Sequence, residues 1–324
     1  MLGYLPRVLQ RFYRTRAGGQ LLDLHAGLQR PGKIFQYLQP TLEAAEVVAG
    51  ATTDVAKVLE LLRKMPIDDF GIFLLNLPNP EYPRLSALLP RMAAPAVQTA
   101  WTGTSGFALL QQTATFVRLL DHNFQALTGQ PLHQVPVLDF GCGWGRIIRL
   151  LYYFADPSLI YGCDPWDESI KICEADDVLG QLAISDYLPS RLPFDRREFD
   201  LIYAFSVFTH LSTRAAAAAL NVLSEALSDR GVLAITIRPV EYWRHKASLS
   251  DQQRTVLEAE HAARGFAFFP HNHAPVDGDI TFGDSSMSLE YLEKNFPALH
   301  LRKFERTLAD PYQLVLFFTK RSAG

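Results

Sequence analysis

Cysteine is scarce in this sequence of 324 residues, which has only Cys142, Cys163 and Cys173 and no CxxC pair. An odd number of cysteines without paired spacing argues against a disulfide framework, so we expect a reducing, cytoplasmic setting. Long apolar runs are also missing, and no segment reaches the length that spans a bilayer. The amino terminus has no uncharged apolar block of the kind found in a secretory signal.

An excess of basic charge is missing as well, because 31 Lys and Arg residues stand against 34 Asp and Glu residues. Without a global positive field, the protein is not expected to bind nucleic acid. One local exception is a pattern of apolar residues and arginines near the amino terminus, made up of Leu2, Leu5, Val8, Leu9 and Phe12 with Arg7, Arg11, Arg14 and Arg16. A helix here would have a basic face for peripheral membrane contact, or it would pack on its own protein; we favour packing.

The length of the chain favours two structural units, and its hydrophobic fraction of 48% is that of a globular protein. From about Tyr4 to Leu88 the sequence predicts helices interrupted by Gly and Pro, without recognisable chemistry. The sequence has no internal repeat. We therefore predict a helical amino-terminal lobe over residues 1–100 and a second domain over residues 101–324.

The second domain begins with an amphipathic helix that ends at Gly129, and the pattern then changes. Short apolar runs predict strands at 137–140, 159–163, 182–184, 201–205 and 232–237. Helical patterns separate three pairs of these strands, at 146–154, 168–175 and 213–227. This alternation indicates an α/β fold with a parallel sheet. Two final strands, 299–306 and 313–320, are joined by a short turn and must be antiparallel.

A glycine-rich loop follows the first predicted strand. Asp139 lies near the end of that strand, and Gly141, Gly143 and Gly145 follow at alternate positions before a helix begins. Glycine permits a positive φ in a tight turn and lets a ligand approach the backbone more closely than any Cβ allows. The Asp139 carboxylate can accept a hydrogen bond from an ammonium group or from the amides of the loop.

The next strand ends at Asp164, nineteen positions after Gly145. A carboxylate in this place can accept hydrogen bonds from both hydroxyls of a ribose, so the unit is predicted to bind a nucleoside. A nicotinamide-binding loop has the same plan but requires its third glycine one position later, where this chain has Arg146. That mismatch disfavours a nicotinamide cofactor.

With these motifs, the chain from Phe107 onward resembles the class I S-adenosylmethionine-dependent methyltransferases. The resemblance implies a seven-stranded, mostly parallel, Rossmann-like sheet with an antiparallel last strand, and S-adenosylmethionine as cofactor. In that family the acid after the third strand faces the adenine, which implies Asp186 here. The implied cofactor contacts from the strands and their loops are Asp139, Gly141, Cys142, Gly143, Gly145, Asp164, Pro165, Asp186, Tyr187 and Phe205.

Upstream of these motifs, the polar segment from Trp101 to Gly106 occupies the place where family members often carry a lid. The resemblance therefore adds Trp101 and Gly103 to the expected cofactor contacts. The alternative is a linker between lobes, in which Trp101 is a packing anchor.

Candidate bases for the methyl acceptor are histidines. His210 follows the fourth strand at the ligand-binding edge of the sheet; the alternative is a histidine that braces the next helix. Residues 238–289 are longer than one crossover helix requires, so we predict a substrate-side insertion. It contains His271 and His273 in a polar surface loop that runs to Asp284. This loop is predicted to line the acceptor pocket, with a metal site or a plain solvated loop as alternatives.

The sequence therefore predicts an enzyme that methylates a hydroxyl or amine of a small molecule, such as a sugar or a natural product. An RNA or protein methyltransferase is the alternative. The net charge of -3 and the lack of an Asn-Pro-Pro-Tyr motif argue against RNA as the acceptor. A non-catalytic, cofactor-binding subunit is another, although the intact glycines argue against it. No residue pattern predicts the oligomeric state.

Overall fold

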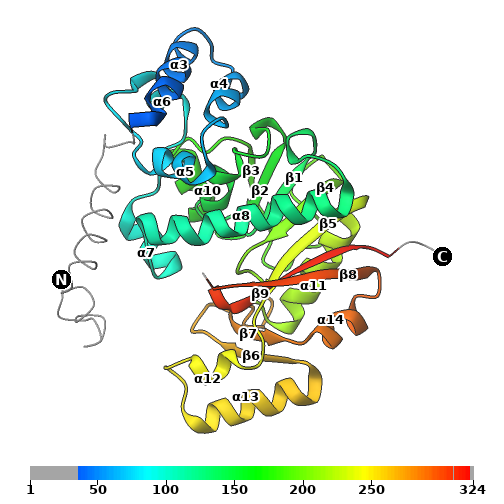
Figure 1. The fold of residues 1–324 in the computed structure, drawn as a ribbon. Coiled ribbons are helices and arrows are strands. Elements are labelled where there is room, and N and C mark those ends of the chain that lie inside the picture. Colours follow the sequence, from blue (N-terminus) through cyan, green and yellow to red (C-terminus); the bar gives the residue numbers. More distant parts are fainter. Residues whose placement is uncertain (1–35, 309, 322–324) are drawn as a thin grey trace, which may run out of the picture. The chain divides into compact units, whose positions relative to one another are not determined.

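The computed structural model of the protein describes residues 36–308 and 310–321 (Figure 1). The basic segment between Leu2 and Arg16 lies outside the described residues. The chain divides into two compact units, one up to Ala114 and one from Thr115 onward. The domain boundary expected near residue 100 remains a prediction.

The first unit is helical, as predicted. Its apolar faces supply fully buried side chains such as Leu42, Leu59 and Phe73. Asp54 caps one helix by accepting a hydrogen bond from the Ala56 amide. The helices are α3 (Gln39–Ala49), α4 (Val55–Leu62), α5 (Ile67–Leu75), α6 (Pro83–Leu88), α7 (Pro95–Thr102) and the start of α8 (Gly106–Thr128), preceded by the 3₁₀ turn η1 (Gln36–Leu38).

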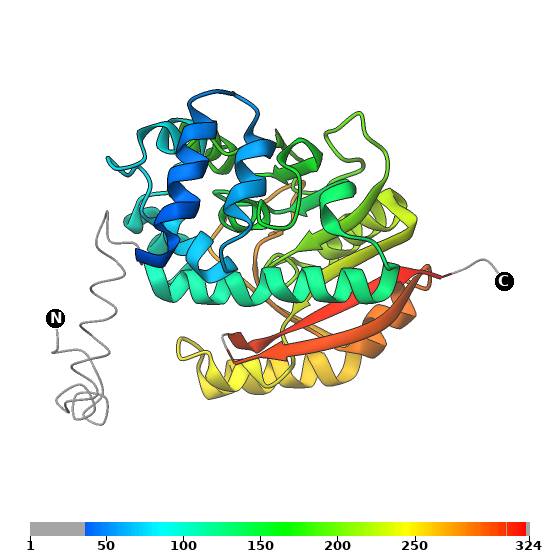
Figure 2. The same ribbon diagram turned by 45° about the horizontal axis from the view of Figure 1, so that its top comes forward.

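The second unit contains the predicted seven-stranded sheet, in the order β3-β2-β1-β4-β5-β9-β8. The first five strands are parallel, and β9 is antiparallel to both of its neighbours. Figure 2 shows β8 and β9 as a long antiparallel pair. The strands are β1 (Val137–Phe140), β2 (Ile160–Asp164), β3 (Gln181–Ile184), β4 (Phe199–Ala204), β5 (Leu227–Ile237), β8 (Leu299–Thr307) and β9 (Asp310–Lys320).

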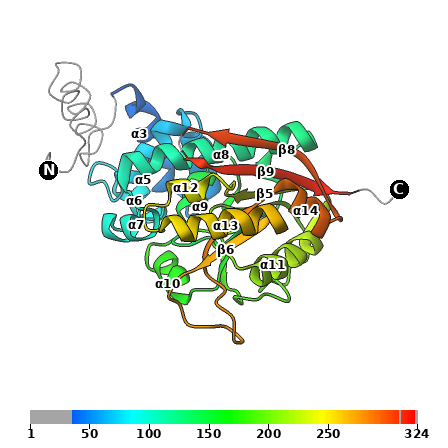
Figure 3. The ribbon, with the colours of Figure 1, turned by 90° about the horizontal axis from the view of Figure 1, so that it is seen from below.

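Helices cover both faces of this sheet. In Figure 3, strands β5 and β9 lie between α8 on one side and α11 and α14 on the other. The main core joins strand residues such as Phe199 and Phe318 to Leu220 and Leu223 of α11. The helices of this unit include α9 (Arg146–Leu151), α10 (Asp167–Ala175), α11 (Thr213–Ala226) and α14 (Leu289–Asn295), with 3₁₀ turns η2 (Leu132–Gln134) and η3 (Pro157–Leu159).

Strand β5 starts earlier than predicted. The segment between the predicted helix 213–227 and the predicted strand 232–237 is already extended, and Leu227 pairs with Phe199 ahead of a register shift. Gly231 permits this path, because a Cβ there would lie 3.0 Å from the carbonyl oxygens of Phe199 and Asp200. The difference affects the amino-terminal side of the strand, away from the edge where its carboxyl end lies.

The segment after β5 contains α12 (Tyr242–His245), α13 (Asp251–Arg264) and a two-stranded sheet of β6 (Phe266–Pro270) and β7 (Gly283–Met287). Trp243 and Leu257 form a small second core with Ala267. The predicted polar surface loop from His271 to Asp284 is wrong at its end. Residues from Gly283 are a buried strand, and Asp284 is 2% exposed because β7 pairs with β6 and also bonds the loop after β4.

Candidate active site

The parallel order of β1 to β5 brings their carboxyl ends to one edge of the sheet. Strands β2 and β3 follow on one side of β1, and strands β4 and β5 follow on its other side. The order in which strands are added to the sheet therefore switches sides at β1. Such a switch point leaves a crevice outside the strand ends, where ligands of α/β proteins bind. The sequence motifs predicted to carry chemistry follow these strand ends.

The glycine loop after β1 has a backbone that only glycine adopts readily. Gly141, Gly143 and Gly145 have φ values of 78°, 54° and 74°. The amide of Gly141 donates a hydrogen bond to the Cys163 carbonyl at 2.7 Å, which ties the loop to β2. A Cβ on Gly141 would lie 2.4 Å from Cγ2 of Val207, so the loop is closely packed against the segment after β4.

Asp164 holds the same loop from the end of β2. Its Oδ2 accepts the Gly143 amide at 2.9 Å, and its Oδ1 accepts the Trp166 amide at 3.0 Å. Burial raises the pKa of Asp164, against the opposing effect of these two amides. Each carboxylate oxygen has more than one acceptor site, so capacity remains for ribose hydroxyls. The predicted ribose contact stays a prediction.

Asp139 is an acid in an otherwise apolar, fully buried strand. Its Oδ2 makes no hydrogen bond of ordinary geometry among the described residues, and burial, opposed by the nearby Tyr203 hydroxyl, raises the pKa of Asp139 to about 8. Arg146, the first residue of α9, lies with its guanidinium carbon 4.9 Å from the centre of the Phe205 ring. Burial lowers the pKa of Arg146 to about 10. A buried carboxylate oxygen without a hydrogen bond, next to the glycine loop, suits a cationic group such as the ammonium of S-adenosylmethionine.

The other expected cofactor contacts, including Asp186 on the adenine side, lie in the loops after β1, β2 and β3. Pro165 and Tyr187 are half-buried, Asp186 is exposed, and Cys142 is buried in the loop itself. The ring of Tyr187 lies 6.3 Å from the His273 ring, so the insertion reaches this part of the edge. The expected cofactor roles of these residues remain predictions.

Phe205 directly follows the last residue of β4. It is half-buried and makes an edge-to-face contact with Phe116 of α8, with ring centres 4.5 Å apart. Trp101 and Gly103 belong to the first unit, where Gly103 ends α7 with a φ of 76°. Their approach to the cofactor remains a prediction.

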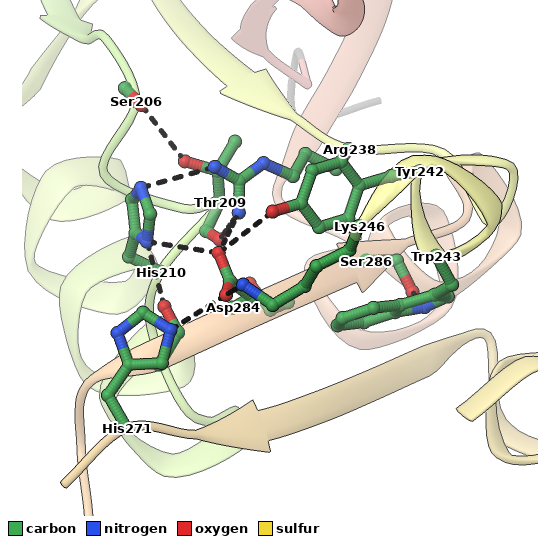
Figure 4. Close-up of polar contacts among 12 residues, drawn as sticks. Ser206, Thr209, His210, Arg238, Tyr242, Trp243, Lys246, His271, Asp284 and Ser286 are labelled. Atoms are coloured by element: carbon green, nitrogen blue, oxygen red, sulfur yellow. Dashed lines mark hydrogen bonds and ion pairs between the residues drawn. The ribbon is translucent and has the colours of Figure 1, made fainter. Parts of the chain in front are cut away.

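A polar cluster lies beyond the ends of β4 and β5 (Figure 4). We name it the Asp284 cluster: Asp284 with Arg238, Lys246, Tyr242 and His271. Arg238 Nη1 donates to Asp284 Oδ1 at 2.5 Å, Tyr242 donates to the same oxygen at 3.1 Å, and Lys246 and His271 contact Oδ2. Burial alone would raise the pKa of Asp284, but Lys246, Arg238 and His271 hold it well below its usual range.

His210 is attached to this cluster by both ring nitrogens. Its Nδ1 lies 2.7 Å from the Gly283 carbonyl oxygen and 3.6 Å from Asp284 Oδ1, and its Nε2 lies 3.3 Å from Nη2 of Arg238. Burial, with a contribution from Arg238, lowers the pKa of His210 to about 4. The imidazole is therefore neutral at physiological pH.

His273 is exposed, and its Nδ1 lies 3.3 Å from the carbonyl oxygen of Ala274. Its ring lies 5.8 Å from Phe282. The metal alternative receives no geometric support, because the described residues contain no group of three or more His, Cys, Asp or Glu side chains that could hold a metal ion. The structure brings His210 and His271 together, with ring centres 6.4 Å apart.

Sequence reasoning missed Arg238 and Lys246, the two cations of the Asp284 cluster. Arg238 offered a signal, since it follows directly on the last residue of β5 and therefore stands at the ligand-binding edge. Lys246 offered none, because its approach to Asp284 depends on the path of the insertion.

Comparison with known proteins matches part of the second unit to a family model. Residues 138–235, which run from β1 into β5, match the family model described as "Methyltransferase domain". No curated protein matches the chain. The chain carries a class I S-adenosylmethionine-dependent methyltransferase domain. The protein is thus an S-adenosylmethionine-dependent methyltransferase, with S-adenosylmethionine as its cofactor.

Solved methyltransferase structures are distant matches. An S-adenosylmethionine-dependent methyltransferase from Clostridium acetobutylicum is 12% identical, with a TM-score of 0.46, over 70% of this chain and 97% of that one. Magnesium protoporphyrin IX methyltransferase from Synechocystis, with S-adenosylhomocysteine bound, is 16% identical, with a TM-score of 0.43, over 68% and 90%. A glycopeptide N-methyltransferase complexed with sinefungin is 12% identical, with a TM-score of 0.42, over 62% and 85%.

The described helices give no sign of a membrane span. Within residues 36–308 and 310–321, none is both long enough and apolar enough to cross a bilayer.

Proposed function

We propose that this methyltransferase acts on a hydroxyl or amine of a small molecule, such as a sugar or a natural product. The observation that carries the proposal is the Asp284 cluster. It gathers a carboxylate, two cations, a phenol and an imidazole at the same sheet edge as the glycine loop. Polar side chains that converge in this way suit the recognition of a compact, polar acceptor.

S-adenosylmethionine supplies an electrophilic methyl group on a sulfonium. In the proposed arrangement Asp164 holds the ribose hydroxyls, Asp139 accepts the ammonium, and the amides of the glycine loop lie against the cofactor. The chain then has to align the acceptor with the methyl group, exclude water and take up a proton. Residues 238–289 are proposed as the substrate-side insertion that does so.

The remaining domain assignment is part of the same proposal. Residues 1–100 form a helical lobe that shapes the acceptor side, and residues 101–324 form the methyltransferase domain. The buried, free thiols of Cys142, Cys163 and Cys173 support the proposal of a reducing, cytoplasmic compartment. The net charge of -3 continues to disfavour RNA as the acceptor.

The proposal is tested in two stages. Mass spectrometry of the purified protein under denaturing conditions should detect S-adenosylmethionine or S-adenosylhomocysteine that it carries. Radiolabelled S-adenosylmethionine is then incubated with small hydroxyl and amine compounds, and in parallel with total RNA and a protein extract. Label in a small compound supports the proposal, whereas label only in RNA or protein contradicts it.

A further inference from the structure

The three candidate histidines differ in what their ring nitrogens contact. A carbonyl oxygen only accepts hydrogen bonds and a guanidinium only donates them. His210 must therefore carry its proton on Nδ1, which faces the Gly283 carbonyl, and direct its lone pair at Arg238. The lone pair of His210 is already in use, and its low pKa agrees with a poor proton acceptor.

His271 has the opposite arrangement. Its Nε2 lies 2.7 Å from Oδ2 of Asp284, a carboxylate that Arg238 and Lys246 keep ionised. An ionised carboxylate only accepts, so Nε2 carries a proton, and in the neutral ring Nδ1 then carries the lone pair. Among the described residues, Nδ1 of His271 makes no hydrogen bond, and the side chain is 36% exposed. Asp284 thus orients the His271 ring through Nε2, and Nδ1 is left without a hydrogen bond among the described residues.

Phe282 supplies an apolar surface beside the His271 ring. Its ring stacks on His210 at 5.3 Å, and its centre lies 5.5 Å from His271 and 5.8 Å from His273. Phe282 is nevertheless 38% exposed, an uncommon position for a phenylalanine that contacts three imidazoles. The carbon skeleton of an acceptor can pack on this face while its polar group meets His271.

We propose that His271, through Nδ1, is the general base of the methyl transfer, and that Asp284 is the positioning residue that fixes its tautomer. This inference rests on the proposed function and narrows the acceptor to a hydroxyl compound. A neutral hydroxyl is a weak nucleophile that needs a base as it attacks, whereas a neutral amine attacks unaided.

The step balances without a further reactant. The acceptor oxygen forms a bond to the methyl carbon while its proton moves to Nδ1 of His271. The carbon–sulfur bond breaks, and its electron pair stays on sulfur, which leaves neutral S-adenosylhomocysteine. His271 then gives the proton to water. Because Asp284 is held ionised by Arg238 and Lys246, it can stabilise the imidazolium without taking the proton itself.

The first test reads the tautomer in the full-length protein and needs no acceptor. Long-range proton–nitrogen NMR on protein labelled with ¹⁵N-histidine, assigned with His271→Gln and His210→Gln variants, should show His271 protonated on Nε2 and His210 on Nδ1 at pH 7. A proton on Nδ1 of His271, or on both of its nitrogens, overturns the proposal whether or not an acceptor is known.

The second test measures turnover with radiolabelled S-adenosylmethionine. The probes are catechol, 4-nitrophenol and glucose, with 4-nitroaniline and glucosamine as amine counterparts. His271→Gln keeps a donor where Nε2 contacts Asp284 but has no basic lone pair. We expect it to lower kcat for the hydroxyl probes by roughly 100-fold or more, the usual contribution of a general base, with cofactor affinity unchanged.

The matched control is His300→Gln, an exposed histidine of β8 whose strand partner is Thr319, toward the opposite edge of the sheet. It should keep wild-type kcat. Equal kcat in His271→Gln and wild type, or methylation of the amine probes alone, overturns the base assignment. If no probe is methylated although S-adenosylhomocysteine binds, the proposed acceptor class is wrong. The NMR measurement of the His271 tautomer then still tests whether Asp284 positions His271 as a base.

Discussion

At the scale of single residues, Asp139 combines burial, an orphaned oxygen and a raised pKa. With a pKa of about 8 it is protonated at pH 6.5, and a bound ammonium would favour its ionised form. Binding of S-adenosylhomocysteine at pH 6.5 should therefore release about one proton, and affinity should rise between pH 6 and pH 7.5. Calorimetry in two buffers of different ionisation enthalpy measures the proton count.

The variant Asp139→Asn provides the comparison, because the amide cannot release a proton. It should bind the cofactor product with no dependence of the heat on the buffer. If wild type and variant release the same number of protons, the released proton comes from another group and Asp139 does not meet the ammonium.

Asp164 permits a second test at the same scale. The variant Asp164→Ala should weaken S-adenosylhomocysteine binding by about 1.5 to 3 kcal/mol, the usual range for a hydrogen bond to a charged group. The matched control is Asp167→Asn, an exposed acid of α10 paired with Lys171, which should bind as wild type does. Because Asp164 also holds two backbone amides, the melting temperature of the free variant must be recorded beside the affinity. Unchanged affinity would remove Asp164 from the site.

At the scale of elements, the glycine loop is the junction on which cofactor binding depends. Gly143 has a φ of 54° and donates its amide to Asp164. Gly143→Val should abolish stabilisation by S-adenosylhomocysteine in a thermal melt while the circular dichroism spectrum stays nearly native. Gly129→Val is the matched control, since Gly129 also has a positive φ, 72°, but nothing lies within 4 Å of its added Cβ.

Both glycine variants should lose stability in the free protein, by about 1 to 3 kcal/mol for a strained backbone position. Only Gly143→Val should lose the response to the cofactor. A response that survives in that variant would show that the loop does not approach the cofactor closely.

The elements that the sequence predicted are those with a periodic pattern of their own. Strand β1 was predicted with its observed bounds because a short apolar run stands directly before glycines, and the closing pair β8 and β9 followed from a short connection. The β6–β7 pair was missed because β7 reads Gly-Asp-Ser-Ser-Met, which has no strand pattern. Its burial comes from bonds to the loop after β4, such as the Ser285 amide to the Thr209 carbonyl.

The candidate site divides in the same way. Asp139 and Asp164 could be found because a local motif fixes their spacing. The Asp284 cluster could not, because Arg238 and Asp284 are 46 positions apart and meet only through the path of the insertion. The sequence does not distinguish His210 from His271 as a base. Their hydrogen-bond partners do, because both ring nitrogens of His210 have partners, whereas His271 has a partner on Nε2 alone among the described residues.

At the scale of the whole molecule, the two compact units differ in chemistry. The glycine loop, Asp139, Asp164 and the Asp284 cluster all belong to the unit that starts at Thr115. In its described part the first unit consists of helices, and of the predicted cofactor contacts it carries Trp101 and Gly103. A division of this kind predicts that cofactor binding and turnover respond differently when the first unit is removed.

A fragment of residues 104–324 tests that division. It keeps the whole of α8, including Leu110, which belongs to the first unit and packs there against Gly71, so Leu110→Gln in the fragment avoids a newly exposed apolar side chain. We expect S-adenosylhomocysteine affinity to fall by no more than about tenfold, or 1.4 kcal/mol, because only Trp101 and Gly103 of the predicted contacts are lost. Turnover should be lost with the lobe proposed to shape the acceptor side.

The full-length variant Trp101→Ala separates the two contributions of the first unit. It should reproduce most of the loss of cofactor affinity in the fragment while it keeps measurable turnover, if Trp101 packs over the methionine end of the cofactor. Full activity in the fragment would leave the helical lobe without a role in the reaction. Full cofactor affinity in both proteins would instead assign Trp101 to packing between helices, which is the alternative that its sequence position allows.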